Sequence, residues 1–379
     1  MEINVFTAFS GYDSQCMALE KAGVKYDLVG WSEIDKFAIQ AHNALFPQFK
    51  DRNFGDICKI DWKNVPDFDL FTYSSPCQDF SRAGKMMGGG ENSGTRSSLL
   101  WECRKAIMAK KPKYLILENV RDLVSKRFFP LFSKWMEELD RMGYDNHWQV
   151  VNASDCNCPQ NRQRVILVSI RRFEFPKPQD LTNTLETMME KEIDPKYYVP
   201  ANQVGCVLES QPLQDSLLVR QATKKGYIEV RKGGLFDSSF PRSETRRGRV
   251  QGDGGDICPT LTASASDCIM RFEGFRDGEP IIRRLTEREI FRFMGVGDNQ
   301  ITQIQDQQIG LRQQRKLAGN SICVNVLEGV FRQMFNEQIK KTMESIFTIG
   351  KRVRVAELSE NQTNRGGGVK LTMAELRTW

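Results

Sequence analysis

A cysteine that follows a short apolar run is the residue of this chain best suited to nucleophilic chemistry. The run Phe68–Tyr73 (FDLFTY) predicts a buried strand, and Ser75-Pro76-Cys77-Gln78 comes shortly after it. Pro76 fixes its own φ angle and restricts the residue before it, so the backbone presents Cys77 stiffly. A thiolate is a strong nucleophile, but it forms at neutral pH only beside positive or hydrogen-bonding groups. A Pro-Cys pair alone predicts little, because most cysteines are small buried side chains.

Polar residues also follow three other apolar runs of strand length. The pairs of run and polar group are Ile3–Phe9 with Ser10-Gly11, Tyr26–Trp31 with Glu33, and Tyr114–Leu117 with Glu118-Asn119. Such runs, alternating with amphipathic segments, predict a mostly parallel sheet with helices on both faces. The carboxyl ends of parallel strands share one edge of the sheet, and ligands bind there. We therefore expect these groups and Cys77 to converge on one site.

The elements that position these groups form repeated strand–loop–helix units. Helices are predicted over about 16–22, 36–45 and 98–110, the first with its N-cap at Asp13 or Ser14, and a further strand over Val165–Ile170. After Arg172 several prolines mark a linker region. A stretch rich in Gly, Ser, Thr and Arg follows, and it predicts a small domain that is mainly β or irregular. Helical periodicity returns at Leu285 and again over Ser321–Phe335.

These patterns predict an α/β chain with a large Rossmann-like domain and a smaller, mainly β or irregular one. We expect the large domain to comprise residues 1–174 and about 310–340. The small domain with its hinge would cover 175–309, and a C-terminal extension 341–379.

Composition excludes several classes of protein. The chain has 379 residues, 40% hydrophobic and 27% charged, with no apolar run of membrane-spanning length. Its first residues, MEINVFTAF, lack a basic region and predict no signal peptide, so we expect a cytoplasmic protein. The ten cysteines are scattered without a CxxC pair, and the two histidines lack ligand spacing to them, so we expect free thiols and no metal site.

Positive charge is concentrated in one stretch. The net charge is only +6, but residues 220–249 hold nine Lys or Arg against three acids. The stretch is either a solvated surface or a patch that binds phosphate groups.

The order of motifs resembles that of the DNA cytosine-5 methyltransferases, especially those of bacteria and phages, over about Ile3 to Phe335. The matching elements are Phe9-Ser10-Gly11, Glu33, Gly55-Asp56-Ile57, Pro76-Cys77-Gln78, Glu118-Asn119-Val120, Gln160-Asn161-Arg162-Gln163-Arg164, Arg284-Leu285-Thr286, Arg288-Glu289 and Gly319-Asn320-Ser321. Each motif is common, but their order and spacing together are specific.

The resemblance implies roles for four catalytic residues. Cys77 would add to C6 of cytosine, which makes C5 nucleophilic enough to take a methyl group. Glu118 would hydrogen-bond or protonate N3, a task that needs a raised pKa. Arg164 would orient Glu118 and cytosine O2, and Arg162 would line the same site or the DNA backbone.

The resemblance also implies S-adenosylmethionine as cofactor. The implied contacts are Phe9, Ser10 and Gly11 below it, Glu33 on the ribose hydroxyls, Asp56 near the adenine amino group, Leu99 at the pocket wall, and Asn320 and Ser321 at the methionine end. Ile34, Ile57 and Pro76 are further implied contacts. The chain departs from the family's FxGxGG pattern, because Asp13 and Ser14 replace the second and third glycines. Thr7 also stands where family members often have Asp.

The implied substrate is double-stranded DNA with the target cytosine flipped out of the duplex. The small domain would read the sequence, the glycine-rich loop after Cys77 would close over the base, and the protein would act as a monomer without metal or membrane. The implied DNA contacts are Gln78, Ser81, Arg82, Lys85, Arg96, Arg247, Arg249 and Thr260.

Three rival functions remain open from the sequence. An RNA (tRNA) cytosine-5 methyltransferase would use the same cysteine and cofactor, although the basic small domain favours duplex DNA. An inactive DNA-binding homologue is disfavoured by the presence of Cys77, Glu118, Arg162 and Arg164. An NAD-dependent oxidoreductase is disfavoured by the missing GxGxxG pattern.

Overall fold

The computed structural model describes residues 2–75 and 99–336. The chain divides into two units, Met1–Met334 and Phe335–Trp379, and all the helices and strands discussed below belong to the first.

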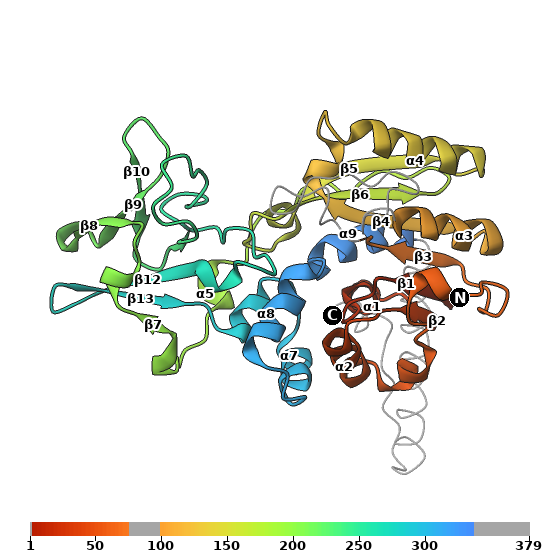
Figure 1. The fold of residues 1–379 in the computed structure, drawn as a ribbon, viewed down its shortest axis with the longest axis horizontal. Helices are drawn as coiled ribbons and strands as arrows, with labels where there is room; N and C mark the ends of the chain where they lie inside the picture. Colours follow the sequence, from red (N-terminus) through yellow and green to blue (C-terminus); the bar gives the residue numbers. More distant parts are fainter. Residues whose placement is uncertain (1, 76–98, 337–379) are drawn as a thin grey trace, which may run out of the picture. The chain divides into compact units, whose positions relative to one another are not determined.

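The large sheet has six strands in the order β2-β1-β3-β4-β6-β5 (Figure 1). Their bounds are β1 Ile3–Ala8, β2 Tyr26–Ser32, β3 Leu70–Tyr73, β4 Tyr114–Val120, β5 Asn146–Asn152 and β6 Gln163–Ser169. The first four strands pair in parallel, whereas β6 pairs antiparallel with both β4 and β5. The chain crosses between neighbours on either side of β1, which is the topological position where α/β sheets bind ligands.

Helices pack on this sheet as the alternation of apolar runs predicts. Their bounds are α1 Ser14–Ala22, α2 Lys36–Leu45, α3 Leu100–Lys110, α4 Phe129–Arg141 and α9 Val324–Met334, and α1 packs against α9. Trp101 of α3 and Trp135 of α4 meet edge to face, 5.4 Å between ring centroids, in the core beneath β3 and β4. The indole N–H of Trp135 donates to the Tyr73 hydroxyl at 3.2 Å, so this large aromatic core leaves no indole donor unsatisfied there.

Two smaller antiparallel sheets follow in the sequence. One has the order β10-β9-β8 and the other β11-β12-β13-β7. Their strands are β7 Tyr198–Val199, β8 Val207–Gln211, β9 Ser216–Arg220, β10 Tyr227–Arg231, β11 Leu235–Asp237, β12 Ile269–Arg276 and β13 Glu279–Arg284. They share a core that includes Val219, Val230, Phe236 and Phe272. The mixed α/β class, with a smaller and mainly β part, is confirmed.

Short helices connect the small sheets back to α9. They are α5 Leu185–Met188, α6 Glu287–Arg292, α7 Asp298–Gln305 and α8 Leu311–Asn320. Thr286 and Glu289 form a capping box that starts α6. Buried Arg283 donates to both oxygens of Glu289 at 2.8 Å, so the end of β13 is fixed to the start of this helix.

The sequence-based boundaries of the last helix and of β4 differ in the structure. The last helix begins at Val324 rather than Ser321, and β4 extends through Glu118 and Asn119 instead of ending before them. Strand β5 and helix α4 were not predicted. β5 is an edge strand whose burial follows neither a continuous apolar run nor a regular alternation.

Within residues 2–75 and 99–336, no helix is both long and apolar enough to cross a membrane. In the same ranges, no three His, Cys, Asp or Glu side chains gather where they could hold a metal ion.

Candidate active site

The ends of β1, β2 and β3 lie level with one another and with Leu117 inside β4. Ala8 of β1 pairs with both Ser32 of β2 and Tyr73 of β3, and Tyr73 pairs with Leu117 of β4. The residues that come next in the chain are Phe9, Glu33, Ser74 and Glu118. The strand register therefore brings the expected polar groups to one edge of the sheet.

Glu33 is anchored at this edge by three backbone amides. Its Oε2 accepts from Gly11 N–H at 2.9 Å, and its Oε1 accepts from Ile34 and Asp35 N–H at 2.7 and 2.8 Å. The side chain of Ile34 beside it is 72% exposed. The arrangement presents a fixed acceptor next to an uncovered apolar side chain, a combination that suits a sugar hydroxyl joined to a flat base.

The turn after β1 is built without the second and third glycines of the usual pattern. Phe9, Gly11 and Asp13 all have left-handed φ angles, of 56°, 60° and 67°. Asp13 is the N-cap of α1, and its buried carboxylate accepts from Cys16 N–H at 3.2 Å and from the Thr7 hydroxyl at 2.8 Å. A left-handed non-glycine residue costs about 1–2 kcal/mol, and these two hydrogen bonds offset that cost.

His42 completes this buried cluster. Its Nε2 lies 3.5 Å from an oxygen of Asp13, and its ring stacks on Trp31 with 3.7 Å between centroids. The sequence did not predict these contacts of Thr7, Asp13 and His42. The sequence did contain a signal for this cluster. Asp13 stands where the family pattern has a glycine, and Thr7 stands where family members often have Asp.

Two buried hydroxyls at the strand ends have no hydrogen-bond partner within residues 2–75 and 99–336. They are Ser10 Oγ, after β1, and Ser75 Oγ, after β3. The carbonyl of Ser75 is held by Asn119 Nδ2 at 3.2 Å. Since buried polar atoms are nearly always paired, the two hydroxyls indicate an edge shaped for a polar ligand.

Glu118 and Arg164 form a buried ion pair at the same edge. Arg164 Nε lies 3.0 Å from Glu118 Oε1. Burial raises the pKa of the Glu118 carboxyl above its usual range, while the guanidinium groups of Arg164 and Arg162 act against this rise. The site thus holds a carboxyl group that retains its proton to a higher pH than an exposed one.

Arg162 joins three segments that lie far apart in the sequence. Its buried guanidinium donates to the carbonyls of Leu261 at 2.6 Å, Gly319 at 3.1 Å and Ser321 at 2.5 Å. These bonds occupy the two terminal nitrogens, and none goes to Glu118. The structure therefore shows Arg162 holding these three segments together, and its expected place at the site or on the DNA backbone stays a prediction.

The same three segments also meet through their backbones. Gln160 pairs with Cys258 in an isolated parallel bridge, and the Thr260 hydroxyl donates to the Asn161 carbonyl. A Cβ at Gly319 would stand 2.4 Å from the Ala263 amide nitrogen, so only glycine allows α8 to approach so closely.

The remaining cofactor candidates within the described ranges make local hydrogen bonds, cap a short helix or pack on the main core. Ser321 Oγ donates to Ser14 Oγ at 3.2 Å, and Asn320 is exposed at the end of α8. Asp56 caps the short 3-10 helix Ile57–Lys59 by accepting from Cys58 N–H at 3.1 Å. Ile57 is buried and Leu99 packs beside it on the main core.

Several expected site residues lie outside the described ranges. They are Pro76, Cys77, Gln78, Ser81, Arg82, Lys85 and Arg96.

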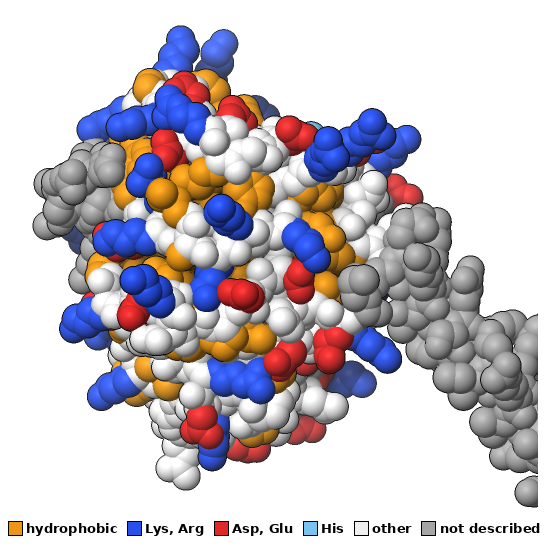
Figure 2. Space-filling model, turned by 90° about the vertical axis from the view of Figure 1, so that its right-hand side faces the viewer, with side chains coloured by type: hydrophobic (Ala, Val, Ile, Leu, Met, Phe, Trp, Pro, Cys, Tyr) orange, Lys and Arg blue, Asp and Glu red, His pale blue; other side chains and the backbone are white. Residues whose placement is uncertain are grey.

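One expected DNA contact is wrong. Arg249 is fully buried and donates to the carbonyls of Asp237, Ser239 and Phe240, so its charge does not reach the surface. Arg247 is exposed. The face in Figure 2, at the large-sheet end of the molecule, shows Lys and Arg interspersed with Asp and Glu. That face therefore presents no patch of a single charge.

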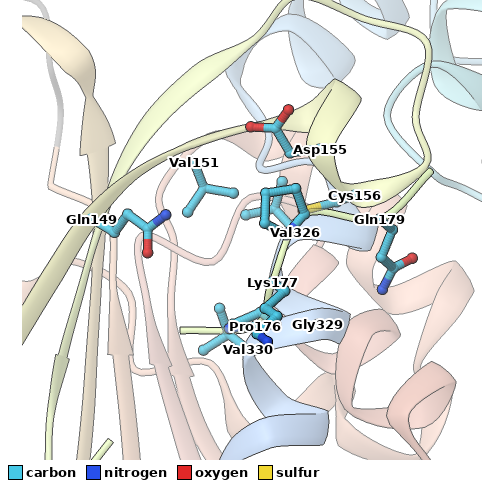
Figure 3. Close-up of a pocket in the computed structure, with 11 residues that line it drawn as sticks. Gln149, Val151, Asp155, Cys156, Pro176, Lys177, Gln179, Val326, Gly329 and Val330 are labelled. Carbon is cyan, nitrogen blue, oxygen red and sulfur yellow. The ribbon is translucent and has the colours of Figure 1, made fainter. Parts of the chain in front are cut away.

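A small pocket away from this edge is not suited to the chemistry. It lies between β5, the 3-10 helix Ala153–Cys156, the segment 176–179 and α9 (Figure 3). Its volume of about 20 Å³ has room for about one water molecule. Burial raises the pKa of its cysteine, Cys156, to about 12, so this thiol is not a nucleophile at neutral pH.

A family model described as C-5 cytosine-specific DNA methylase matches residues 3–336. Type II methyltransferase M2.ScrFI of Lactococcus lactis subsp. cremoris is 34% identical, with 89% of this chain and 100% of the relative covered. Orphan methyltransferase M.SPRI of Bacillus phage SPR is 28% identical, with 90% of this chain and 100% of the relative covered.

Two solved structures share the fold at 16% identity. The Entamoeba histolytica methyltransferase EhMeth matches with a TM-score of 0.65, and S. pombe Dnmt2 methyltransferase with 0.61. Each match covers 89% of this chain and 99% of the other chain.

Proposed function

This chain belongs to the C-5 cytosine-specific DNA methylases, and from that premise we propose that it transfers a methyl group from S-adenosylmethionine to C5 of a flipped-out cytosine in duplex DNA. The observation that carries the proposal is the buried Glu118–Arg164 pair, which shares a sheet edge with the anchored carboxylate of Glu33. At this one edge, Glu118 can hydrogen-bond a ring nitrogen of the base and Glu33 can accept from ribose hydroxyls.

The residues present fit S-adenosylmethionine. Glu33 would accept the ribose hydroxyls, exposed Ile34 would cover the adenine, and Ser10, Ser75 and Ser321 would face the amino-acid end. The missing glycines do not argue against this fit, because the cofactor has no pyrophosphate that needs a backbone cradle. When bound, the cofactor supplies a methyl group on a sulfonium, a good leaving group.

Cys77 is proposed as the nucleophile. Its thiolate forms a bond to C6 of cytosine, and the ring electrons move to C5, which takes the methyl group. A base then removes the C5 proton, the C5–C6 double bond re-forms, and the thiolate leaves. As the thiolate leaves, N3 returns its proton to the group that donated it, and the completed sequence of steps restores the enzyme to its starting state.

Glu118 is proposed to donate its proton to N3 as the thiolate adds, which prevents negative charge from accumulating on the ring. Its raised pKa supports this assignment, since only the protonated carboxyl can donate. Arg164 holds the carboxyl in place through Nε and has other donors for the carbonyl oxygen of the base.

The small sheets within 175–309 are proposed to read the DNA sequence, and the large sheet with residues of about 310–340 to perform the chemistry. Arg162 supports this division, since it fixes the Leu261 segment of the small part against β6 and the end of α8. A cytosine inside a duplex is inaccessible, so the base must leave the stack to reach Glu118.

Base-resolution mapping of 5-methylcytosine tests the function. The chain is expressed in a cell that lacks cytosine methylation, with Glu118→Gln as the matched inactive control. We expect methylation at one short motif with the wild-type chain and none with the variant. An unmodified genome, despite folded protein that binds S-adenosylmethionine, would overturn DNA as the substrate and favour RNA.

A further inference from the structure

An exposed aromatic ring projects from the loop between β11 and β12. Phe240 is 70% exposed, more than any other aromatic side chain within residues 2–75 and 99–336. Its φ angle of 52° is left-handed. A bulky residue is unusual in this conformation, and glycine or asparagine would meet the backbone requirement at lower cost. The fold therefore does not explain why a phenylalanine stands there.

The backbone around Phe240 is held rigidly from below. The buried guanidinium of Arg249 donates to the carbonyls of Asp237 at 2.9 Å, Ser239 at 2.7 Å and Phe240 at 2.7 Å. The Asp237 carboxylate in turn accepts from Ser239 N–H at 2.8 Å. Pairing of Phe236 with Val250 closes the base of the loop. The ring is thus presented by a built turn rather than by a loose tip.

Positive charge surrounds the ring. Residues 238–249, which we call the Phe240 loop, contain four arginines and one acid, Glu244. Arg246 places its guanidinium 5.7 Å from the centre of the Phe240 ring and pairs with Asp237. No acid within the described ranges forms an ion pair with exposed Arg242 or Arg247.

A second basic segment adjoins this loop. The Arg246 carbonyl accepts from Ala222 N–H at 2.9 Å, which brings the β9–β10 turn with Lys224 and Lys225 alongside (Figure 1). Both lysines are exposed. The surface thus combines a rigid, exposed ring with cations around it, the combination by which proteins bind duplex DNA through apolar contacts to base edges and polar contacts to phosphates.

We propose that Phe240 packs its ring against a base of the bound duplex while the surrounding arginines and lysines contact phosphates. The proposal rests on the function proposed above and deepens it by naming a base-contacting residue. Arg249, expected from the sequence to touch DNA, acts instead by holding the turn that presents this ring.

Binding of a duplex that carries the mapped methylation motif tests the proposal. Phe240→Ala should raise Kd roughly 5- to 100-fold, the usual cost of losing one base contact in a duplex site. Phe240→Trp keeps an aromatic ring at this position, so its Kd should stay close to that of the wild type. Leu213→Ala, at a 98% exposed apolar side chain elsewhere in the small sheets, is the control and should leave Kd unchanged.

Salt dependence separates ring contact from charge contact. The slope of log Kd against log salt should be unaltered in Phe240→Ala, whereas Arg247→Gln should reduce it by about 1 if this arginine contacts a phosphate. Urea unfolding of Phe240→Ala should match that of the wild type, which excludes a structural role. If the wild type methylates its motif and Phe240→Ala binds as tightly as wild type, this inference alone is overturned. If the wild type neither binds nor methylates DNA, the proposed function is overturned together with this inference.

Discussion

Arg164 Nε lies 3.0 Å from Glu118 Oε1 at the start of β6, where the chain returns antiparallel to β4. The contact has two opposing effects on the carboxyl group. Burial raises its pKa, and the guanidinium charge limits the rise. The ion pair therefore fixes the orientation of the Glu118 carboxyl, while the pKa of this group remains raised so that it can still donate a proton.

The first prediction is an alkaline limb in the pH–rate profile. If protonated Glu118 is the donor, kcat/KM falls as pH rises through its raised pKa, because the carboxyl then loses its proton. Arg164→Met removes a charge that lowers this pKa, so the limb should move to higher pH even though the rate is reduced. Glu118→Gln should lower kcat/KM about 10²- to 10⁴-fold. A limb that moves to lower pH in Arg164→Met would contradict the assignment.

The sheet edge was predictable because local patterns determine it. Short apolar runs followed by Gly11 and Glu33 indicate strand ends, and parallel strands necessarily bring such ends together. The cap at Asp13 was predictable for the same reason, since a cap is defined by its neighbours in the chain.

The contacts of Arg162 were not predictable in this way. Its acceptors Leu261 and Ser321 lie 99 and 159 positions away, and no local pattern indicates a backbone carbonyl as a partner. The burial of Arg249 was missed for a similar reason, because a run of arginines is typical of a surface. Only the fold shows that one of them faces inward.

A second prediction concerns the stability that Arg162 provides. Arg162→Met leaves three buried carbonyls without their donor, so the free energy of unfolding should fall by roughly 2–5 kcal/mol. Arg247→Met, which removes an exposed guanidinium, is the control and should change it by less than about 0.5 kcal/mol. Urea unfolding measures both. Equal stability of the two variants would show that Arg162 does not join the three segments energetically.

A third prediction concerns the turn after β1. Asp13→Ala removes an N-cap and keeps a left-handed backbone, so it should cost about 2–3 kcal/mol of unfolding free energy. Asp13→Asn retains an acceptor oxygen and tolerates the left-handed angle, so it should cost less. Asp35→Ala is the control, because Asp35 caps α2 with an extended φ of −74°.

The same turn carries the amide of Gly11 that fixes Glu33. Affinity for S-adenosylmethionine, measured by calorimetry, should therefore weaken about tenfold in Asp13→Ala, and much less in Asp13→Asn. If Asp13→Ala is no worse than Asp35→Ala in both measurements, the acid at position 13 does not replace the missing glycines.

The last prediction tests Cys77 as the nucleophile. A duplex with 5-fluorocytosine at the target position has no C5 proton to lose, so the thiolate bond to C6 should persist after methyl transfer. The wild-type chain should then form a complex with the duplex that survives denaturation, whereas Cys77→Ser should bind the duplex without forming one. Cys156→Ser, at a half-buried thiol in the pocket of Figure 3, is the control and should form the complex. A covalent complex in Cys77→Ser, or appreciable methyl transfer by it, would exclude Cys77 from this role. Loss of the complex in both variants would point to a general loss of structure, which urea unfolding of each variant would reveal.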